Sequence, residues 1–313
     1  MLIRFTVRNY KTFREKAELS LVASNYDKER ENDNIIDDAT SGLKVLKSAV
    51  IYGANASGKS KLMEALYFMR SFVLKSSKES QKGEAIDIEP FLLNTASELE
   101  PTEFEVIFLH NKAQYRYGFE VTTKVVVSEW FYHKPHTKEV ELFLRDNQDF
   151  TIHPRSFPTG KMLVKQNFVR ENVLMLSAAA QWNDVLAGSV MDWFRSLKVI
   201  SGLEEDAYAG FTMKRTDDPE LKQKHLEFLQ RADLDIQDIS LERLDLSQLP
   251  KDMPREIREL LERKVTDEKE QLVSDVLTSH KKYDADKNHV VDVNFSLRED
   301  ESSGTRKFFF LSG

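Results

Sequence analysis

The stretch Gly53-Ala54-Asn55-Ala56-Ser57-Gly58-Lys59-Ser60, called the phosphate loop below, decides how this sequence is interpreted. It matches the pattern G-x-x-x-x-G-K-[ST] at every fixed position. Glycine lets a backbone turn tightly and brings its N–H groups close to a phosphate. The apolar run 49–52 precedes the loop, and apolar residues at helical spacing follow it over 62–73. A strand, a glycine loop and a helix in this order present free N–H groups and the positive end of the helix dipole to an anion.

Each residue of the loop has an expected role at a triphosphate. Lys59 is expected to reach the β- and γ-phosphates, and the Ser60 hydroxyl is expected to ligate Mg²⁺. The remaining positions are expected to surround the phosphates with backbone N–H groups: Gly53, Ala54, Asn55, Ala56, Ser57 and Gly58. The expected cofactors are therefore ATP and Mg²⁺.

The composition describes a soluble globular protein. The chain has 313 residues, of which 41% are hydrophobic and 31% charged, enough for one large domain or two ordinary ones. The net charge of -7 does not support nucleic-acid binding over a broad face. A local basic groove is compatible with this net charge, so DNA binding stays a hypothesis. Without cysteine, a membrane-length apolar stretch or a signal peptide, the sequence predicts a cytoplasmic protein with no membrane contact.

The first part of the chain shows the period of β-strands. Apolar and polar residues alternate over 3–8 and again over 17–21, which predicts a hairpin. Strand-like segments recur at 104–109, 115–121 and 125–131, whereas 25–38 is polar and predicts a solvated loop. These segments predict an N-terminal sheet lobe that carries the phosphate loop, at residues 1–135.

The later part predicts a helical and irregular lobe at residues 136–290. Asp218-Pro219 is a favourable helix start, with a capping carboxylate followed by proline at the first helical position. A turn at 284–288 leads into a predicted strand at 291–297. Helices are predicted at 173–180, 190–197, 254–264 and 267–277.

Glu301-Ser302-Ser303-Gly304-Thr305, called the signature segment below, follows a predicted strand and precedes the apolar run 308–311. Two interpretations stay open at this point. Ser and Thr favour helix N-caps, so the segment can simply begin a helix. Small residues before a helix also present N–H groups to a phosphate.

Taken together, these segments resemble one branch of the ABC-type ATPases. The sequence Tyr-Gly-Ala-Asn-Ala-Ser-Gly-Lys-Ser at 52–60 lies behind an N-terminal hairpin with Asn-Tyr-Lys-Thr-Phe at 9–13. With the signature segment, this resembles the SMC/RecF-like branch and most closely the bacterial AAA-labelled ATPases of phage-defence and abortive-infection systems, including OLD-like and RloA-like proteins. Further similar stretches lie at 91–93, 115–119 and 232–234. The resemblance implies an α/β fold, an ABC-ATPase-like head with a mixed sheet lobe around the phosphate loop, an inserted helical lobe, and a final part at 291–313.

The resemblance also implies a mechanism in which two heads hold ATP between them. The phosphate loop of one copy binds the phosphates, while Ser302, Ser303 and Gly304 of the other copy reach the γ-phosphate. Such a chain is expected to form a homodimer or a higher homo-oligomer. A nucleotide shifts an equilibrium only by contacting one state better than the other, so ATP would favour the closed pair.

One expected element is missing from the sequence. Heads of this kind carry an apolar strand that ends in Asp-Glu after the signature, where the Asp helps to hold Mg²⁺ and the Glu orients water. Two weak substitutes are 125–129, which offers Ser128 in place of Asp, and 290–292, which has one carboxylate. We expect the chain to be a piece of a longer protein, with a natural fragment that only binds ATP as the alternative. In either case we expect it to bind ATP and to hydrolyse it poorly, with no catalytic residue in the chain.

The leading functional hypothesis is an ATP-dependent switch or sensor subunit in bacterial anti-phage defence, acting through a separate effector protein. The alternatives are a RecF-like DNA repair or recombination ATPase, a non-hydrolysing ATP-binding scaffold and, less favoured, a small-molecule P-loop kinase. His133 and His136 lie near each other in the sequence and are expected to be loop residues without a metal. The three tryptophans are expected to lie in the core.

Overall fold

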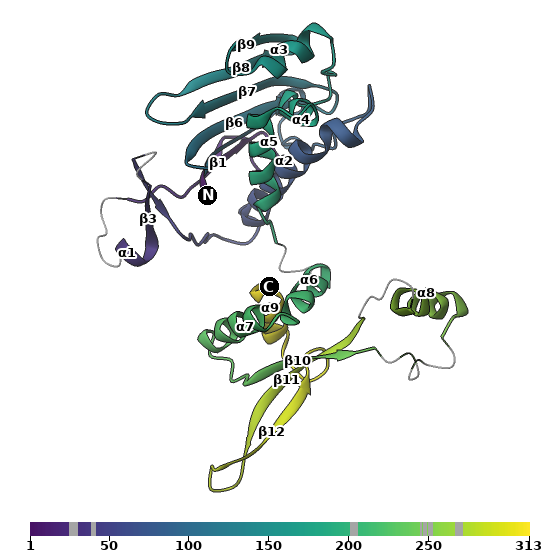
Figure 1. Ribbon diagram of the computed structural model, residues 1–313. Helices are drawn as coiled ribbons and strands as arrows, with labels where there is room; N and C mark the ends of the chain where they lie inside the picture. The colour runs from purple at the N-terminus through teal and green to yellow at the C-terminus, as the bar shows by residue number, and fades with distance from the viewer. Residues whose placement is uncertain are drawn as a thin grey trace. The chain divides into compact units, whose positions relative to one another are not determined.

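The computed structural model describes residues 1–24, 31–38, 42–200, 206–244, 246, 249, 253–266 and 272–313 (Figure 1). The chain divides into two compact units, Met1–Val199 and Ile200–Gly313, and each is described by itself. The α/β class expected from the sequence is confirmed.

The first unit is built on a seven-stranded sheet in the order β2-β1-β5-β6-β7-β8-β9. Every neighbouring pair in this sheet is antiparallel. A short helix and a two-stranded hairpin follow β2, and the turn η1 (Ser97–Leu99) precedes β5. The strands and the short helix are β1 (Leu2–Arg8), β2 (Ala17–Ser20), α1 (Glu31–Asn34), β3 (Ile35–Asp38), β4 (Leu43–Leu46), β5 (Thr102–His110), β6 (Ala113–Val121), β7 (Val126–Lys134), β8 (Val140–Asp146) and β9 (Asp149–Ile152).

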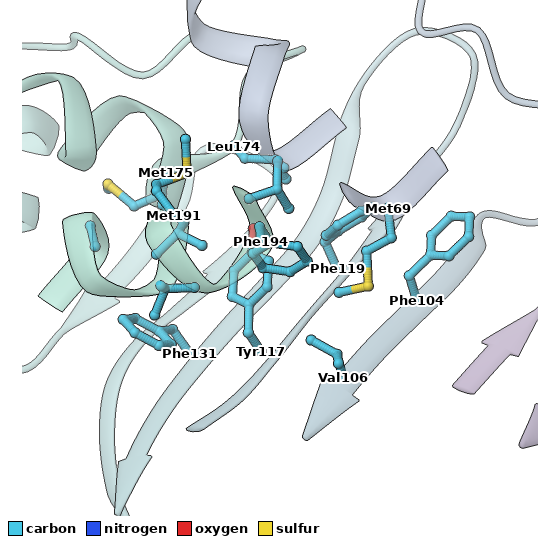
Figure 2. Packing of buried hydrophobic residues seen from close by; sticks show 14 of the residues in the cluster. Met69, Phe104, Val106, Tyr117, Phe119, Phe131, Leu174, Met175, Met191 and Phe194 are labelled. Carbon is cyan, nitrogen blue, oxygen red and sulfur yellow. The ribbon is translucent and has the colours of Figure 1, made fainter. Parts of the chain in front are cut away.

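Helices cover one face of this sheet, and the two-residue period of the strands explains why. Alternate side chains of β5 and β6 are fully buried on that face, and Figure 2 shows Phe104, Tyr117 and Phe119 beside Met69 and Phe194 of the helices. Each fully buried phenylalanine contributes about 1.5–3 kcal/mol relative to an exposed one. The helices are α2 (Lys59–Glu79), α3 (Pro158–Lys165), α4 (Met175–Gln181) and α5 (Val185–Ser196).

Charged residues occupy the other face of the sheet. Arg8 bonds to Glu103 at 3.1 Å and to Glu120 at 3.2 Å, across three strands. Arg116 bonds to Glu139 at 2.9 Å. The predicted strands at 3–8, 17–21, 104–109, 115–121 and 125–131 are thus confirmed by an apolar inner face and a polar outer face.

The second unit combines a three-stranded antiparallel sheet with helices. The sheet has the order β10-β11-β12, and Leu229, Val276 and Phe309 lie in its buried core. Asp218 begins α7 as predicted, because its carboxylate accepts hydrogen bonds from the N–H groups of Glu220 and Leu221. The elements are α6 (Asp206–Thr216), α7 (Pro219–Arg231), β10 (Asp238–Arg243), α8 (Arg255–Thr266), β11 (Val273–Tyr283), β12 (His289–Ser296) and α9 (Ser303–Ser312).

Three local predictions differ from the structure. The apolar run 49–52 forms no strand: Val50 is 72% exposed and Tyr52 is 88% exposed, since no described strand pairs with it. Residues 31–38, predicted as loop, form α1 and β3, with Ile35 opposite Leu46, while 25–30 lie outside the described residues. The helix predicted at 267–277 is wrong for 273–277, which begins β11 and pairs with strands on both sides; 267–271 lie outside the described residues.

The two compact units do not follow the predicted lobe boundaries at 135/136 and 290/291. β7 and β8 are neighbours in one sheet, so that sheet continues past residue 135. Residue 290 lies inside β12. Among the described helices, none is both long and apolar enough to cross a membrane.

Candidate functional site

The phosphate loop forms an exposed turn that runs directly into a long helix. Residues 53–57 are exposed, Gly58 is buried, and α2 begins at Lys59 and continues for 21 residues. The N–H of Ser57 donates to the carbonyl of Ala54 at 3.3 Å, and the N–H of Leu62 donates to the carbonyl of Gly58 at 2.9 Å. The loop therefore curls back on itself immediately before the helix axis begins.

Both fixed glycines are required by this geometry. A Cβ on Gly53 would lie 2.7 Å from the Ser57 hydroxyl oxygen, so a side chain there would fill the space that the loop encloses. Gly58 has φ +92°, a left-handed conformation that favours glycine. A Cβ on Gly58 would also lie 2.9 Å from the Phe13 ring and 3.1 Å from the Thr12 hydroxyl oxygen.

Lys59 places its positive charge over the loop. Its Nζ donates to the carbonyl oxygens of Gly53 at 2.8 Å and Ala54 at 2.7 Å, and no acidic side chain of the described residues pairs with it. The beginning of α2 has no side-chain cap and no acidic residue in its first turn. Free N–H groups, the helix dipole and an ammonium group thus converge, which is the donor set that a polyphosphate requires.

An ion-pair cluster fixes the N-terminal turn against α2. The carboxylate of Glu64 accepts from Lys61 at 2.7 Å and from Lys11 at 3.0 Å, and these hydrogen bonds lower the pKa of Glu64. Lys11 follows β1, so this contact holds Thr12 and Phe13 beside Gly58. Sequence reasoning missed the cluster because nothing in the spacing of Lys11 and Glu64 indicates contact.

Ser60, the predicted Mg²⁺ ligand, is exposed in the first turn of α2. Within the described residues, no group of three or more His, Cys, Asp or Glu side chains could hold a metal ion. Coordination of Mg²⁺ by the Ser60 hydroxyl stays a prediction.

The signature segment begins α9 in the second unit. The Ser302 hydroxyl accepts a hydrogen bond from the N–H of Thr305 at 3.1 Å, so the helix-cap interpretation is confirmed. Ser303 and Gly304 are exposed, and a Cβ on Gly304 would meet nothing closer than 3.5 Å. The fold of this unit therefore does not itself require glycine at 304, and a phosphate contact by Ser302, Ser303 and Gly304 stays a prediction.

Two side chains anchor the start of the signature segment. The Glu301 carboxylate accepts from the Thr278 hydroxyl at 2.6 Å and lies 2.7 Å from Nε2 of His280. Both partners come from β11. The residue before Ser302 is thus bound to the sheet, which orients the beginning of α9.

The two substitutes considered for the missing Asp-Glu pair have other contacts. Glu129 is completely buried and binds the N–H groups of Met175 and Leu176 at the start of α4, at 2.7 and 3.0 Å. Its carboxylate is therefore part of the core and inaccessible to water. Asp292 lies on the exposed strand β12, 2.8 Å from His289.

The prediction that the tryptophans lie in the core is confirmed only for Trp193. Trp130 is half-buried on the charged outer face of the sheet, where its Nε1 donates to the carboxylate of Glu105 at 2.8 Å. Trp193 is buried in the core as expected, but Trp182 is 51% exposed. It ends α4, where it stacks on Phe168, which is 49% exposed.

Comparison with known proteins places the chain in a family. The family model described as "AAA domain, putative AbiEii toxin, Type IV TA system" matches residues 48–313, which include the phosphate loop and the signature segment. No curated protein matches the chain.

Proposed function

The chain belongs to this family of AAA ATPase domains, and from that premise we propose that residues 53–60 bind ATP with Mg²⁺. The observation that carries the proposal is Lys59, held over a glycine loop at the uncapped beginning of α2. Backbone N–H groups of the loop would hold the phosphates and Ser60 would hold Mg²⁺. The phosphates of a bound ATP would supply negative charge to the open end of α2 and to the Lys59 ammonium group, which pairs with no acidic side chain of the described residues.

Stabilisation by the nucleotide tests this step. A ligand at 100 times its Kd stabilises the folded state by about 2.7 kcal/mol. We expect Mg–ATP to raise the Tm of the wild type but not of Lys59→Ala. The matched control is Lys75→Ala on the same helix, whose exposed Lys75 pairs with Glu79. Equal stabilisation of the Lys59→Ala variant would contradict the proposal.

We further propose that ATP joins two copies, with the phosphate loop of one copy facing Ser302, Ser303 and Gly304 of the other. The exposed signature segment and the lack of a fold requirement for glycine at 304 support this proposal. ATP-dependent dimerisation, measured by sedimentation, is the direct test.

Mixing variants distinguishes sites shared between copies from sites within one copy. Neither Lys59→Ala nor Ser302→Arg is expected to dimerise alone with ATP. A mixture is expected to dimerise, because one composite site then contains an intact Lys59 and an intact Ser302. If the mixture stays monomeric while the wild type dimerises, the composite site is wrong.

For the biological role, we propose an ATP-dependent switch in bacterial anti-phage defence that acts through a separate effector. The support is the family description, which names an abortive-infection toxin of a type IV toxin–antitoxin system. We expect the chain itself to turn over ATP poorly, since the candidate Glu129 is buried and Glu64 is bound by two lysines. Rapid hydrolysis that is lost in Lys59→Ala would contradict this expectation.

A further inference from the structure

Phe168 and Trp182 form an exposed aromatic pair on the first unit. Their ring centroids lie 5.3 Å apart and their planes differ by 16°, so the rings are stacked. About half of each side chain is exposed, 49% for Phe168 and 51% for Trp182. Each ring thus covers one face of the other and leaves further aromatic surface in solvent. Val185, 83% exposed at the start of α5, follows shortly after Trp182.

The backbone holds both rings in place. The N–H of Phe168 donates to the carbonyl of Leu163 at 2.9 Å, which ties Phe168 to the last turn of α3. The N–H of Trp182 donates to the carbonyl of Ala179 at 3.0 Å, at the end of α4. Two helix ends therefore present the pair as a fixed surface.

The segment that carries the pair is basic within an acidic chain. Residues 153–185 contain four basic side chains and two acidic side chains, Glu171 and Asp184, and Asp184 caps α5, whereas the whole chain has a net charge of -7. Lys161 and Lys165 are exposed one turn apart on α3, and Arg170 follows Phe168 by two positions. Within the described residues, none of the four basic side chains forms an ion pair: Arg155, Lys161, Lys165 and Arg170.

From this juxtaposition we propose that Phe168 and Trp182 stack on the bases of a single-stranded nucleic acid, and that Lys161 and Lys165 contact its phosphates. Stacked aromatic rings beside unpaired cations are the combination that binds single strands with little sequence preference, since every base has a π-face. An apolar protein partner would use the rings but would give no role to the neighbouring unpaired charges. The site contains no part of the phosphate loop, so it does not depend on ATP binding.

The test measures binding of a fluorescent oligothymidylate to the full chain by anisotropy, without nucleotide. Each substitution removes a ring on which one base would stack, so we expect Trp182→Ala and Phe168→Ala each to weaken oligonucleotide binding about 5- to 150-fold. The matched control is Tyr67→Ala, which removes a 54% exposed aromatic side chain from α2 of the same unit. We expect this control to bind like the wild type.

Salt dependence tests the charged part of the site. Each phosphate contact with a single strand adds about 0.7 to the slope of log K against log salt. The double substitution Lys161→Gln/Lys165→Gln is therefore expected to reduce the slope by about 1.4. The matched control is Lys112→Gln/Lys124→Gln, which changes two exposed lysines in turns at opposite ends of the sheet.

The proposal is overturned if the oligonucleotide does not bind, if Trp182→Ala binds as tightly as the wild type, or if the Tyr67 control loses as much affinity. Lys59→Ala is included to keep this result separate from the proposed ATP site. We expect that variant to bind the oligonucleotide normally.

Discussion

Replacing Glu129 by glutamine tests the most tightly constrained polar group in the first unit. The Glu129 carboxylate accepts from the Tyr117 hydroxyl at 2.9 Å and from two N–H groups of α4, and it lies 3.7 Å from the guanidinium of Arg145. Neither charged side chain has any exposed surface. Burial raises the pKa of Glu129, and the charge of Arg145 opposes that effect.

The substitution Glu129→Gln turns one acceptor into a donor that faces another donor, and it removes the counter-charge of Arg145. Breaking a buried ion pair on one side costs about 3–5 kcal/mol. Arg145 keeps carbonyl acceptors such as those of Asn147 and Val173, both at 2.6 Å, so we expect a loss near the lower end, about 3 kcal/mol. Against a total stability of about 5–15 kcal/mol, this loss is large.

Urea unfolding followed by tryptophan fluorescence measures the loss, because Trp130, Trp182 and Trp193 all lie in the first unit. The control is Glu139→Gln, whose partner Arg116 lies on the outer face of the sheet; a partly exposed pair of this kind is worth about 0–1 kcal/mol. If Glu129→Gln costs no more than this control, Glu129 does not hold α4 as an ionised carboxylate.

Three further outcomes are expected. Gly58→Ala is expected to destabilise the first unit by about 1–2 kcal/mol, because alanine is strained in the left-handed backbone conformation; urea unfolding measures this loss. The added methyl group also meets the Phe13 ring, so the loop is expected to shift and ATP binding to weaken, which ATP titration measures. Burial, and to a lesser extent Arg215, lowers the pKa of His225. The neutral His225 side chain therefore contributes its full stabilisation of the second unit above the ordinary pKa of about 6.5. Below that pH the free energy of unfolding is expected to decrease, by at most about 1.4 kcal/mol per pH unit. Hydrogen exchange in α7 measures this change, and a His225→Asn variant with the same pH dependence would exclude the histidine as its cause. Asp218→Ala is expected to cost about 1 kcal/mol through loss of the N-cap, measured by the same exchange, and an unchanged rate in the first turn of α7 would contradict it.

Much of the first unit was predictable because its strands bury one face and expose the other. Alternation of apolar and polar residues indicates such a strand directly, as at 3–8 and 104–109. A different signal, the continuous apolar run, failed at 49–52, because such a run becomes a strand only when a neighbouring strand supplies hydrogen bonds. The helix prediction failed at 273–277, where Val276 is buried in a strand that pairs with β10 and β12.

The candidate site was predictable at the loop but not around it. The spacing of Gly53, Gly58 and Lys59 identifies the loop, since the glycines let the backbone approach a phosphate and the lysine neutralises the phosphate charge. The packing of Phe13 on Gly58 and the exposure of Trp182 depend on contacts between distant parts of the chain. A single sequence carries no local signal for such contacts.

Isothermal titration calorimetry of the chain with Mg–ATP, in parallel for the wild type and Lys59→Ala, tests the ATP site most directly. A hydrogen bond to a charged group contributes about 1.5–3 kcal/mol, so loss of the ammonium group is expected to weaken binding about 10- to 150-fold. We predict heat of binding for the wild type, with one ATP per chain, and little or none for the variant. Equal heats and equal affinities for the two proteins would contradict the assignment of residues 53–60 as the ATP site.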